Sequence, residues 1–281
     1  MPGDAAVSFV VPTKNSARTI GSCLRSIRAQ SGRPVELVVV DNSSTDGTLE
    51  QACALADVVL TAGPERSAQR NLGAAASHGE HVVFIDSDMV LDPEIASQVV
   101  AEFDLDERLG GLVLPELSFG AGFWAECKVL EKRLYLGDSN VEAARAFRRR
   151  AFDEIGGYDT GLTGPEDWDL PDRLRRAGWA IGRVAATVHH DEGRLRLGDT
   201  FSKKRYYGRT VAPYVARHGR VGARKAARSA LFRKPSRFLH QPRVSLGLLG
   251  LKAVEFTGVV VGVLDGHRSS RVTARRGPGP G

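Results

Sequence analysis

The stretch that most constrains the fold is HVVFIDSDMV at residues 81–90. Its apolar run from Val82 to Ile85 stands between polar residues, which is typical of a strand buried on both faces of a sheet. Asp86 and Asp88 follow on either side of Ser87. In an extended chain, side chains two positions apart point the same way, so both carboxylates would face one spot beyond the strand's carboxyl end. Open α/β sheets bind ligands at that edge, and two carboxylates suit Mg²⁺ or Mn²⁺. A solvated loop after a core strand is the alternative.

Other apolar runs extend this pattern into a sheet. Strands are expected at residues 7–11, 36–40, 58–60 and 181–188, and helices at 17–29, from 48 onward, and at 68–77. Strands that alternate with helices predict an α/β fold with a doubly wound, mostly parallel sheet. The first strand is followed by PTKNS at residues 12–16, which is neither a Rossmann glycine fingerprint nor a phosphate-binding glycine-lysine loop. The sequence therefore argues against a dinucleotide dehydrogenase and against a P-loop enzyme.

The net charge of +6 conceals a division along the chain. Residues 191–281 hold 20 Lys and Arg against 5 Asp and Glu, a balance of +15, whereas residues 1–190 hold 19 against 28, a balance of −9. A basic C-terminal third favours anionic partners such as phosphates, acidic lipid head groups or nucleic acid. The three cysteines have no disulfide or metal-site spacing, and the strand-like start is unlike an export signal, so we expect a reduced, cytoplasmic protein.

Five motifs in order resemble the family 2 glycosyltransferases, an inverting group with the GT-A fold. The motifs are VSFVVPTKNS at 7–16, VVVDNSSTDGT at 38–48, RNLGAA at 70–75, FIDSD at 84–88 and GGYDTGLTGPEDWDLPDRLRRAGW at 156–179. Each motif alone is weak, but their joint order and spacing are specific. Together with His189-His190 they cover roughly residues 5–195. The resemblance implies a GT-A-type, Rossmann-like sheet and a nucleotide diphosphate sugar as donor, with UDP and GDP favoured.

The resemblance also implies roles for residues at the donor side. Those expected to contact the nucleotide sugar are Pro12, Thr13, Asn15, Asp41, Arg66, Arg70, Asp86 and Ser87. Asp88, Asp86 and His189 are expected to bind a divalent cation, Mg²⁺ or Mn²⁺, with Asp88 the favoured direct ligand. A helix or turn cap is the alternative for Asp41, a solvated helix face for Arg66, and a core histidine for His189, while His190 could equally point inward. Ser16 stands where many relatives have an acidic residue.

Glu166 and Asp167 form a second centre of chemistry. An inverting transfer needs a carboxylate that takes the proton from the attacking acceptor hydroxyl. Asp167 matches the family's base, and Glu166 is expected to hold the acceptor or orient the loop. Capping of a helix N-terminus by acidic residues is the alternative. Aromatic and basic residues at 119–150 are expected to build the acceptor side, although packing and a solvated helix explain them equally well.

The sequence predicts four segments: a catalytic domain at 1–195, a basic helical extension at 196–243, an amphipathic or membrane-associated helix at 244–265, and a disordered tail at 266–281. The run at 244–264 is long enough to span a membrane, but Lys252 and Glu255 interrupt it. Each would oppose insertion by about 2.5–3.5 kcal/mol. An interfacial helix on an anionic membrane therefore fits better than a span, and a helix packed on the protein or on a second copy is the other alternative.

These features predict a metal-dependent inverting glycosyltransferase that acts on a lipid-linked or cell-envelope glycan. The protein would lie in the cytoplasm, at the inner face of the plasma membrane. A soluble small-molecule or peptide acceptor is the alternative within the enzyme class. A basic nucleic-acid-binding protein is the alternative of another class, and it is disfavoured because no DNA- or RNA-binding module is recognisable.

Overall fold

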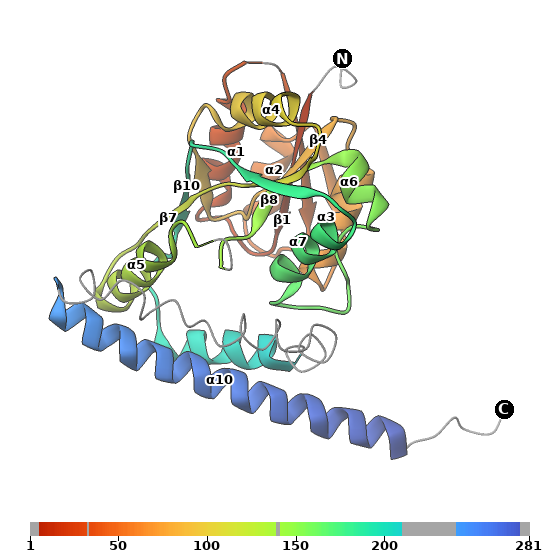
Figure 1. Cartoon of the computed structure of the whole chain (residues 1–281). Helices are drawn as coiled ribbons and strands as arrows, with labels where there is room; N and C mark the ends of the chain where they lie inside the picture. Colours follow the sequence, from red (N-terminus) through yellow and green to blue (C-terminus); the bar gives the residue numbers. More distant parts are fainter. Residues whose placement is uncertain (1–5, 33, 139–140, 210–239, 276–281) are drawn as a thin grey trace. The chain divides into compact units, whose positions relative to one another are not determined.

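The structure is a computed structural model that describes residues 6–32, 34–138, 141–209 and 240–275 (Figure 1). The chain divides into two compact units. The N-terminal unit comprises residues 1–119, 136–160 and 166–192, and the C-terminal unit comprises residues 120–135, 161–165 and 193–281. The last division falls near the expected boundary at 195. Residues 120–135 and 161–165, expected in the catalytic domain, group with the C-terminal unit.

The main sheet of the N-terminal unit has seven strands, in the order β3-β2-β1-β4-β8-β6-β9. Their bounds are β1 (Val7–Thr13), β2 (Val35–Asp41), β3 (Val58–Thr61), β4 (His81–Phe84), β6 (Leu109–Val113), β8 (Ala144–Arg148) and β9 (Ala180–Arg183). β1 is parallel to β2 and β4, β2 is parallel to β3, and β6 is parallel to β9, whereas β8 is antiparallel to both of its neighbours. This topology confirms the expected mostly parallel, doubly wound sheet.

Helices pack on both faces of this sheet, and the side chains of successive strand residues point alternately to one face and the other. Phe9 and Val11 of β1 pack in the cluster that includes residues of α1 (Ile20–Arg28) and α4 (Ile95–Leu105). Val10 between them packs in the cluster that includes residues of α3 (Arg66–Ala75), α6 (Arg149–Glu154) and α7 (Glu166–Arg176). α2 (Thr48–Leu55) joins β2 to β3. This period of two follows from the pleat of a strand buried on both faces.

A second, three-stranded sheet has the order β5-β10-β7, formed by β5 (Met89–Leu91), β7 (Glu116–Phe119) and β10 (Val188–Asp191). The prediction of one strand over residues 181–188 was wrong. The chain forms β9 in the main sheet and β10 in the small sheet, and residues 184–187 connect them outside either sheet. The backbone N–H groups of Ala185 and Ala186 both donate to Oε1 of Gln98, so a side chain satisfies this break in the ladder.

The C-terminal unit contains α5 (Phe123–Tyr135), a helix at residues 197–209, and α10 (Pro242–Arg275), which Figure 1 draws as one long helix. Leu248 and Leu251 of α10 pack with Cys127, Leu130 and Leu134 of α5. α10 continues ten residues beyond 265, so residues 266–275, expected in a disordered tail, are helical. Proline does not occur before Pro278 in this tail, so no proline ends α10 at 266. Most of the expected basic extension, 210–239, lies outside the described residues.

Candidate active site

The two aspartates of the FIDSD motif lie in a turn at the carboxyl edge of the main sheet. The chain leaves the extended conformation after Phe84, and Met89 N donates to the carbonyl oxygen of Asp86 at 3.0 Å. The expectation that an extended chain points Asp86 and Asp88 at one spot therefore does not hold. Asp86 is surrounded by arginines, whereas Asp88 lies 3.3 Å from the imidazole of His190.

Three guanidinium groups converge on Asp86. Its Oδ1 lies 3.1 Å from Arg70 and 3.8 Å from Arg66, and its Oδ2 lies 3.3 Å from Arg145. Burial alone would raise the pKa of Asp86, but the three arginine charges hold it well below its usual value. Asp86 is therefore ionised and held in place by cations from two elements, α3 and β8.

Arg70 connects this cluster to the second centre of chemistry. Its side chain is 1% exposed, and its Nη1 donates to Oδ1 of Asp167 at 2.7 Å while its Nη2 donates to Asp86. The ring of Tyr158 lies 5.0 Å from its guanidinium carbon. A cation this deeply buried requires several charged partners, which accounts for the convergence on it of carboxylates from the turn after β4 and from α7.

Glu166 and Asp167 begin α7 but have different surroundings. The Asp167 side chain is 28% exposed, whereas that of Glu166 is 5% exposed and its Oε1 lies 3.9 Å from Arg70. Oε2 of Glu166 is buried and has no hydrogen-bond partner among the described residues. Burial, and then the charge of Asp167, raise the pKa of Glu166 to about 7. Of the two carboxylates, Asp167 is the more exposed.

The adjacent histidines of β10 face opposite ways, as neighbours in a strand do. His190 Nε2 lies 3.3 Å from Oδ2 of Asp88, and its Nδ1 lies 2.8 Å from Oε1 of Glu116. His189 instead lies 2.9 Å from Asp92. The prediction that His189 joins Asp88 is thus corrected, because the register of β10 gives that position to His190. Burial disfavours the charged ring, yet the hydrogen bonds of His190 to Asp88 and Glu116 raise its pKa to about 10.

Glu116 and Arg145 belong to this site although they were not singled out as site residues from the sequence. Glu116 accepts from Arg145 Nη2 at 3.2 Å, so it joins His190 to the arginines around Asp86. Glu116, His190 and Glu192 also place one ligand atom each within 4.8 Å of the others. Arg145 stands in a basic run that was expected at the acceptor side but equally fits a solvated helix. Glu116 lies in no motif, so it carried no sequence signal.

The loops after β1 and β2 hold one another in place at the same edge. Asp41 accepts from the backbone N and the Oγ of Ser44, at 2.8 and 2.5 Å, so the turn-cap alternative describes its present contacts. Asn15, in the left-handed region at φ 47°, accepts from Thr45 N through its side chain. Ser87 donates to Ser16 at 2.8 Å, which ties the FIDSD turn to the first loop.

Two donor-side residues lie within β1 itself. Pro12 is buried and pairs with Val40, and Thr13 pairs with Asp41. The Thr13 hydroxyl is buried without a partner among the residues that the structure describes. The predicted donor residues are thus gathered at the carboxyl ends of β1, β2 and β4 and at the start of α3.

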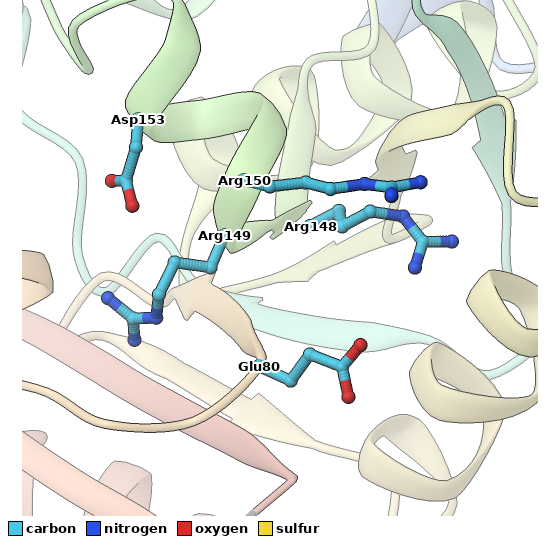
Figure 2. Close-up of a pocket in the computed structure, with 5 residues that line it drawn as sticks. All are labelled: Glu80, Arg148, Arg149, Arg150 and Asp153. Atoms are coloured by element: carbon cyan, nitrogen blue, oxygen red, sulfur yellow. The ribbon is translucent and has the colours of Figure 1, made fainter.

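A hollow of about 330 Å³ lies elsewhere, near the beginning of β4 and α6, and is lined by Glu80, Arg148, Arg149, Arg150 and Asp153 (Figure 2). Its arginines are engaged with backbone carbonyls. Arg148 donates to Phe103 and Leu109, Arg149 donates to Gly79 and Ala74, and Arg150 donates to Glu107. We therefore assign these three arginines to fold stability and not to ligand binding.

The fold and this arrangement of carboxylates and arginines define a GT-A-type α/β protein. The sequence profile described as glycosyl transferase family 2 matches residues 8–156, so the chain belongs to that family. A similar curated protein is the pre-mycofactocin glycosyltransferase of Mycobacterium tuberculosis, 27% identical over 77% of this chain and 49% of the relative. The chain thus spans about half the length of this curated relative.

Solved structures show the same fold. The mannosyltransferase PcManGT from Pyrobaculum calidifontis, in complex with GDP-Man and Mn²⁺, superposes with a TM-score of 0.63 at 17% identity, over 94% of this chain and 88% of that one. Glucosyl-3-phosphoglycerate synthase from Mycobacterium tuberculosis, in complex with Mn²⁺, UDP and glucosyl-3-phosphoglycerate, gives 0.51 at 25% identity, over 75% of this chain and 80% of that one. The resemblance stated from the motifs is confirmed.

Proposed function

We propose that this chain is an inverting glycosyltransferase that moves a sugar from a nucleotide diphosphate sugar to an acceptor hydroxyl or phosphate. The observation that carries the proposal is the buried Arg70, which joins Asp86 at the donor side to Asp167 at the expected base position. Membership of the family supports this assignment. The donor would be a UDP or GDP sugar, since solved structures of similar fold hold UDP or GDP-Man.

Asp88 and His190 are the residues that fit a divalent cation. Oδ1 of Asp88 is buried and lacks a partner within the described part of the chain. A carboxylate suits Mg²⁺ or Mn²⁺, and the imidazole of His190 beside it favours Mn²⁺ of the two. Glu116 would hold the imidazole from its other nitrogen, as carboxylates commonly do behind a ligand histidine. The oxygens of Asp86 already face arginines, so we assign it to the arginine cluster. A bound cation would supply charge neutralisation at the leaving diphosphate.

Asp167 is the proposed base because its carboxylate is the accessible one of the pair. It takes the proton from the acceptor hydroxyl while that oxygen forms a bond to the anomeric carbon. The bond from that carbon to the diphosphate oxygen breaks on the opposite face, its electron pair leaves with the diphosphate, and the configuration inverts. Arg70 positions Asp167 through their 2.7 Å hydrogen bond, and Glu166 supports the start of α7 from its buried position.

For the acceptor, we propose a lipid-linked or cell-envelope glycan at the cytoplasmic face of the plasma membrane. This rests on the +15 charge balance of residues 191–281 and on the apolar helix α10. An enzyme that acts on a soluble acceptor needs neither feature. A soluble small-molecule or peptide acceptor is the competing assignment, and assays with extracted membrane lipids against soluble acceptors separate the two.

Calorimetric binding of UDP, GDP, CDP and dTDP, each with and without Mn²⁺, tests the donor site. We expect one nucleotide to bind only with the ion and to lose that binding in Asp88→Ala and His190→Ala. His189→Ala is the matched control. The imidazole of His189 contacts Asp92 and not Asp88, so its removal should leave nucleotide binding unchanged. Failure of all four nucleotides to bind folded protein, or equal loss in both histidine variants, would contradict the proposed site.

A further inference from the structure

α10 carries an exposed apolar stripe along the side that packs against nothing in the described chain. Its exposed large apolar residues are Leu246, Leu249, Phe256, Val260 and Leu264, with Leu246 72% and Phe256 70% exposed. The spacings of three, seven, four and four residues place them on one helix face. From 246 to 264 that face is about 27 Å long at 1.5 Å per residue. We call these five residues the apolar stripe.

The opposite face of α10 is fully used within the C-terminal unit. Leu248 and Leu251 are buried against α5. Gly258 and Gly262 lie against the backbone of the helix at 197–209, so close that a Cβ on Gly258 would lie 2.8 Å from the Phe201 carbonyl oxygen. The stripe is therefore the only long apolar surface of α10 that its described neighbours leave uncovered.

Both charges in the centre of α10 also belong to the packed face. Lys128 of α5 lies 2.8 Å from Glu255 and 2.8 Å from Glu131, and Lys252 pairs with both glutamates. The side chains of Glu131 and Glu255 are buried in this ion cluster, which Lys204 joins at 3.7 Å from Glu255. Lys252 and Glu255, which interrupt the apolar sequence, are thus paired with charged residues of α5. The apolar stripe itself contains no charge.

These contacts argue against a membrane span, although Pro242–Gly266 is long and apolar enough for one. A spanning α10 would either leave the ion cluster unpaired or take α5 with it into the hydrocarbon region. α5 carries further charges at Glu126, Lys132 and Arg133, and charged side chains are strongly disfavoured there. A helix that lies flat keeps the cluster intact and buries only the stripe.

We propose that the apolar stripe is a membrane-docking surface, with α10 lying in the plane of an anionic lipid bilayer. The net charge of this region indicates the partner: residues 191–281 balance to +15, and exposed cations include Lys203, Arg209 and Arg243. An anionic surface neutralises them, whereas a second copy joined stripe to stripe would bring two such basic units together. The inference deepens the membrane-acceptor part of the proposed function and does not depend on donor chemistry.

Sedimentation of the full chain with lipid vesicles tests this surface. We expect binding to vesicles of phosphatidylcholine with phosphatidylglycerol and much weaker binding to phosphatidylcholine alone. The triple variant Leu246→Ser, Phe256→Ser, Leu264→Ser should bind roughly tenfold more weakly. Leu246→Ser alone should weaken binding measurably, while Leu105→Ser, the same change at an 83% exposed leucine of α4, should not. Circular dichroism checks that each variant is folded.

Three results would overturn the proposal. The triple variant could bind vesicles as well as the wild type does, or the bound protein could resist an alkaline carbonate wash, as a membrane-spanning protein does. The third result is a protein that binds no vesicles but forms a dimer in solution, which Phe256→Ser dissociates. Nucleotide binding by the triple variant should equal that of the wild type. Loss of vesicle binding alone would therefore leave the donor site standing, and loss of nucleotide binding alone would leave the docking surface standing.

Discussion

Glu166 is a buried residue whose ionisation should affect stability. Its folded pKa of about 7 exceeds the ordinary value of 4.5, so between these pH values the folded protein holds a proton that the unfolded chain has released. Stability therefore falls as pH rises through that window, by about 3 kcal/mol in all. We expect Glu166→Gln, which cannot ionise, to match the wild type near pH 5 and to be the more stable protein near pH 8, in thermal unfolding without nucleotide or metal.

The control for this prediction is Glu107→Gln, the same change at an exposed glutamate of the N-terminal unit. It should follow the wild-type stability at every pH. Parallel pH profiles for Glu166→Gln and the wild type would show that Glu166 ionises in its folded surroundings as freely as in the unfolded chain.

At the scale of elements, α10 offers two glycines whose replacement should have opposite effects. A Cβ on Gly250 meets nothing within 4 Å, whereas a Cβ on Gly258 would lie 2.8 Å from the Phe201 carbonyl oxygen and 2.9 Å from Lys204 Cβ. Alanine is favoured over glycine in a helix interior by about 0.5–1 kcal/mol, while overpacking costs about 1–3 kcal/mol. We expect Gly250→Ala to raise the thermal midpoint and Gly258→Ala to lower it, as measured by circular dichroism.

Because the two glycines lie in one helix, helix propensity is common to both changes. Stabilisation by Gly258→Ala would mean that the helix at 197–209 does not pack closely against α10.

The sequence predicted those elements whose pattern is local. Continuous apolar runs predicted β1, β2 and β4. A strand buried on both faces is apolar along its whole length, so it can be identified without knowing which strands it pairs with. The run at 181–188 failed because one apolar stretch serves two sheets, and only the pairing with β6 and β7 divides it into β9 and β10.

Site residues were predictable where a motif fixes them and not where tertiary register does. Asp88 and Asp167 stand in motifs, and in the structure they contact His190 and Arg70, respectively, within the candidate site. Which of His189 and His190 faces Asp88 depends on the register of β10 against β5, which the sequence leaves open. Arg145 and Glu116 reach the site from β8 and β7, neighbours that only the folded sheets bring together.

At the scale of the whole molecule, the two units have separate hydrophobic cores. Two clusters cover the faces of the main sheet, and a third lies between α5 and α10. The proposed nucleotide site lies wholly in the N-terminal unit. We therefore expect calorimetric scans to resolve two transitions, of which UDP or GDP with Mn²⁺ raises only one. Ligand at 100 times its Kd should stabilise that unit by about 2.7 kcal/mol.

A buried leucine in the other core identifies the second transition. Leu130 of α5 is 8% exposed, so Leu130→Ala should lower the midpoint of the C-terminal unit, with a cost of about 2–5 kcal/mol typical of such truncations. Its nucleotide-dependent shift should stay that of the wild type, because Leu130 belongs to none of the clusters around the site. The contrary result would be a single transition whose midpoint is shifted both by the ligand and by Leu130→Ala. The two cores would then unfold as one cooperative unit, because a ligand bound in one core stabilises the other only if their unfolding is strongly coupled.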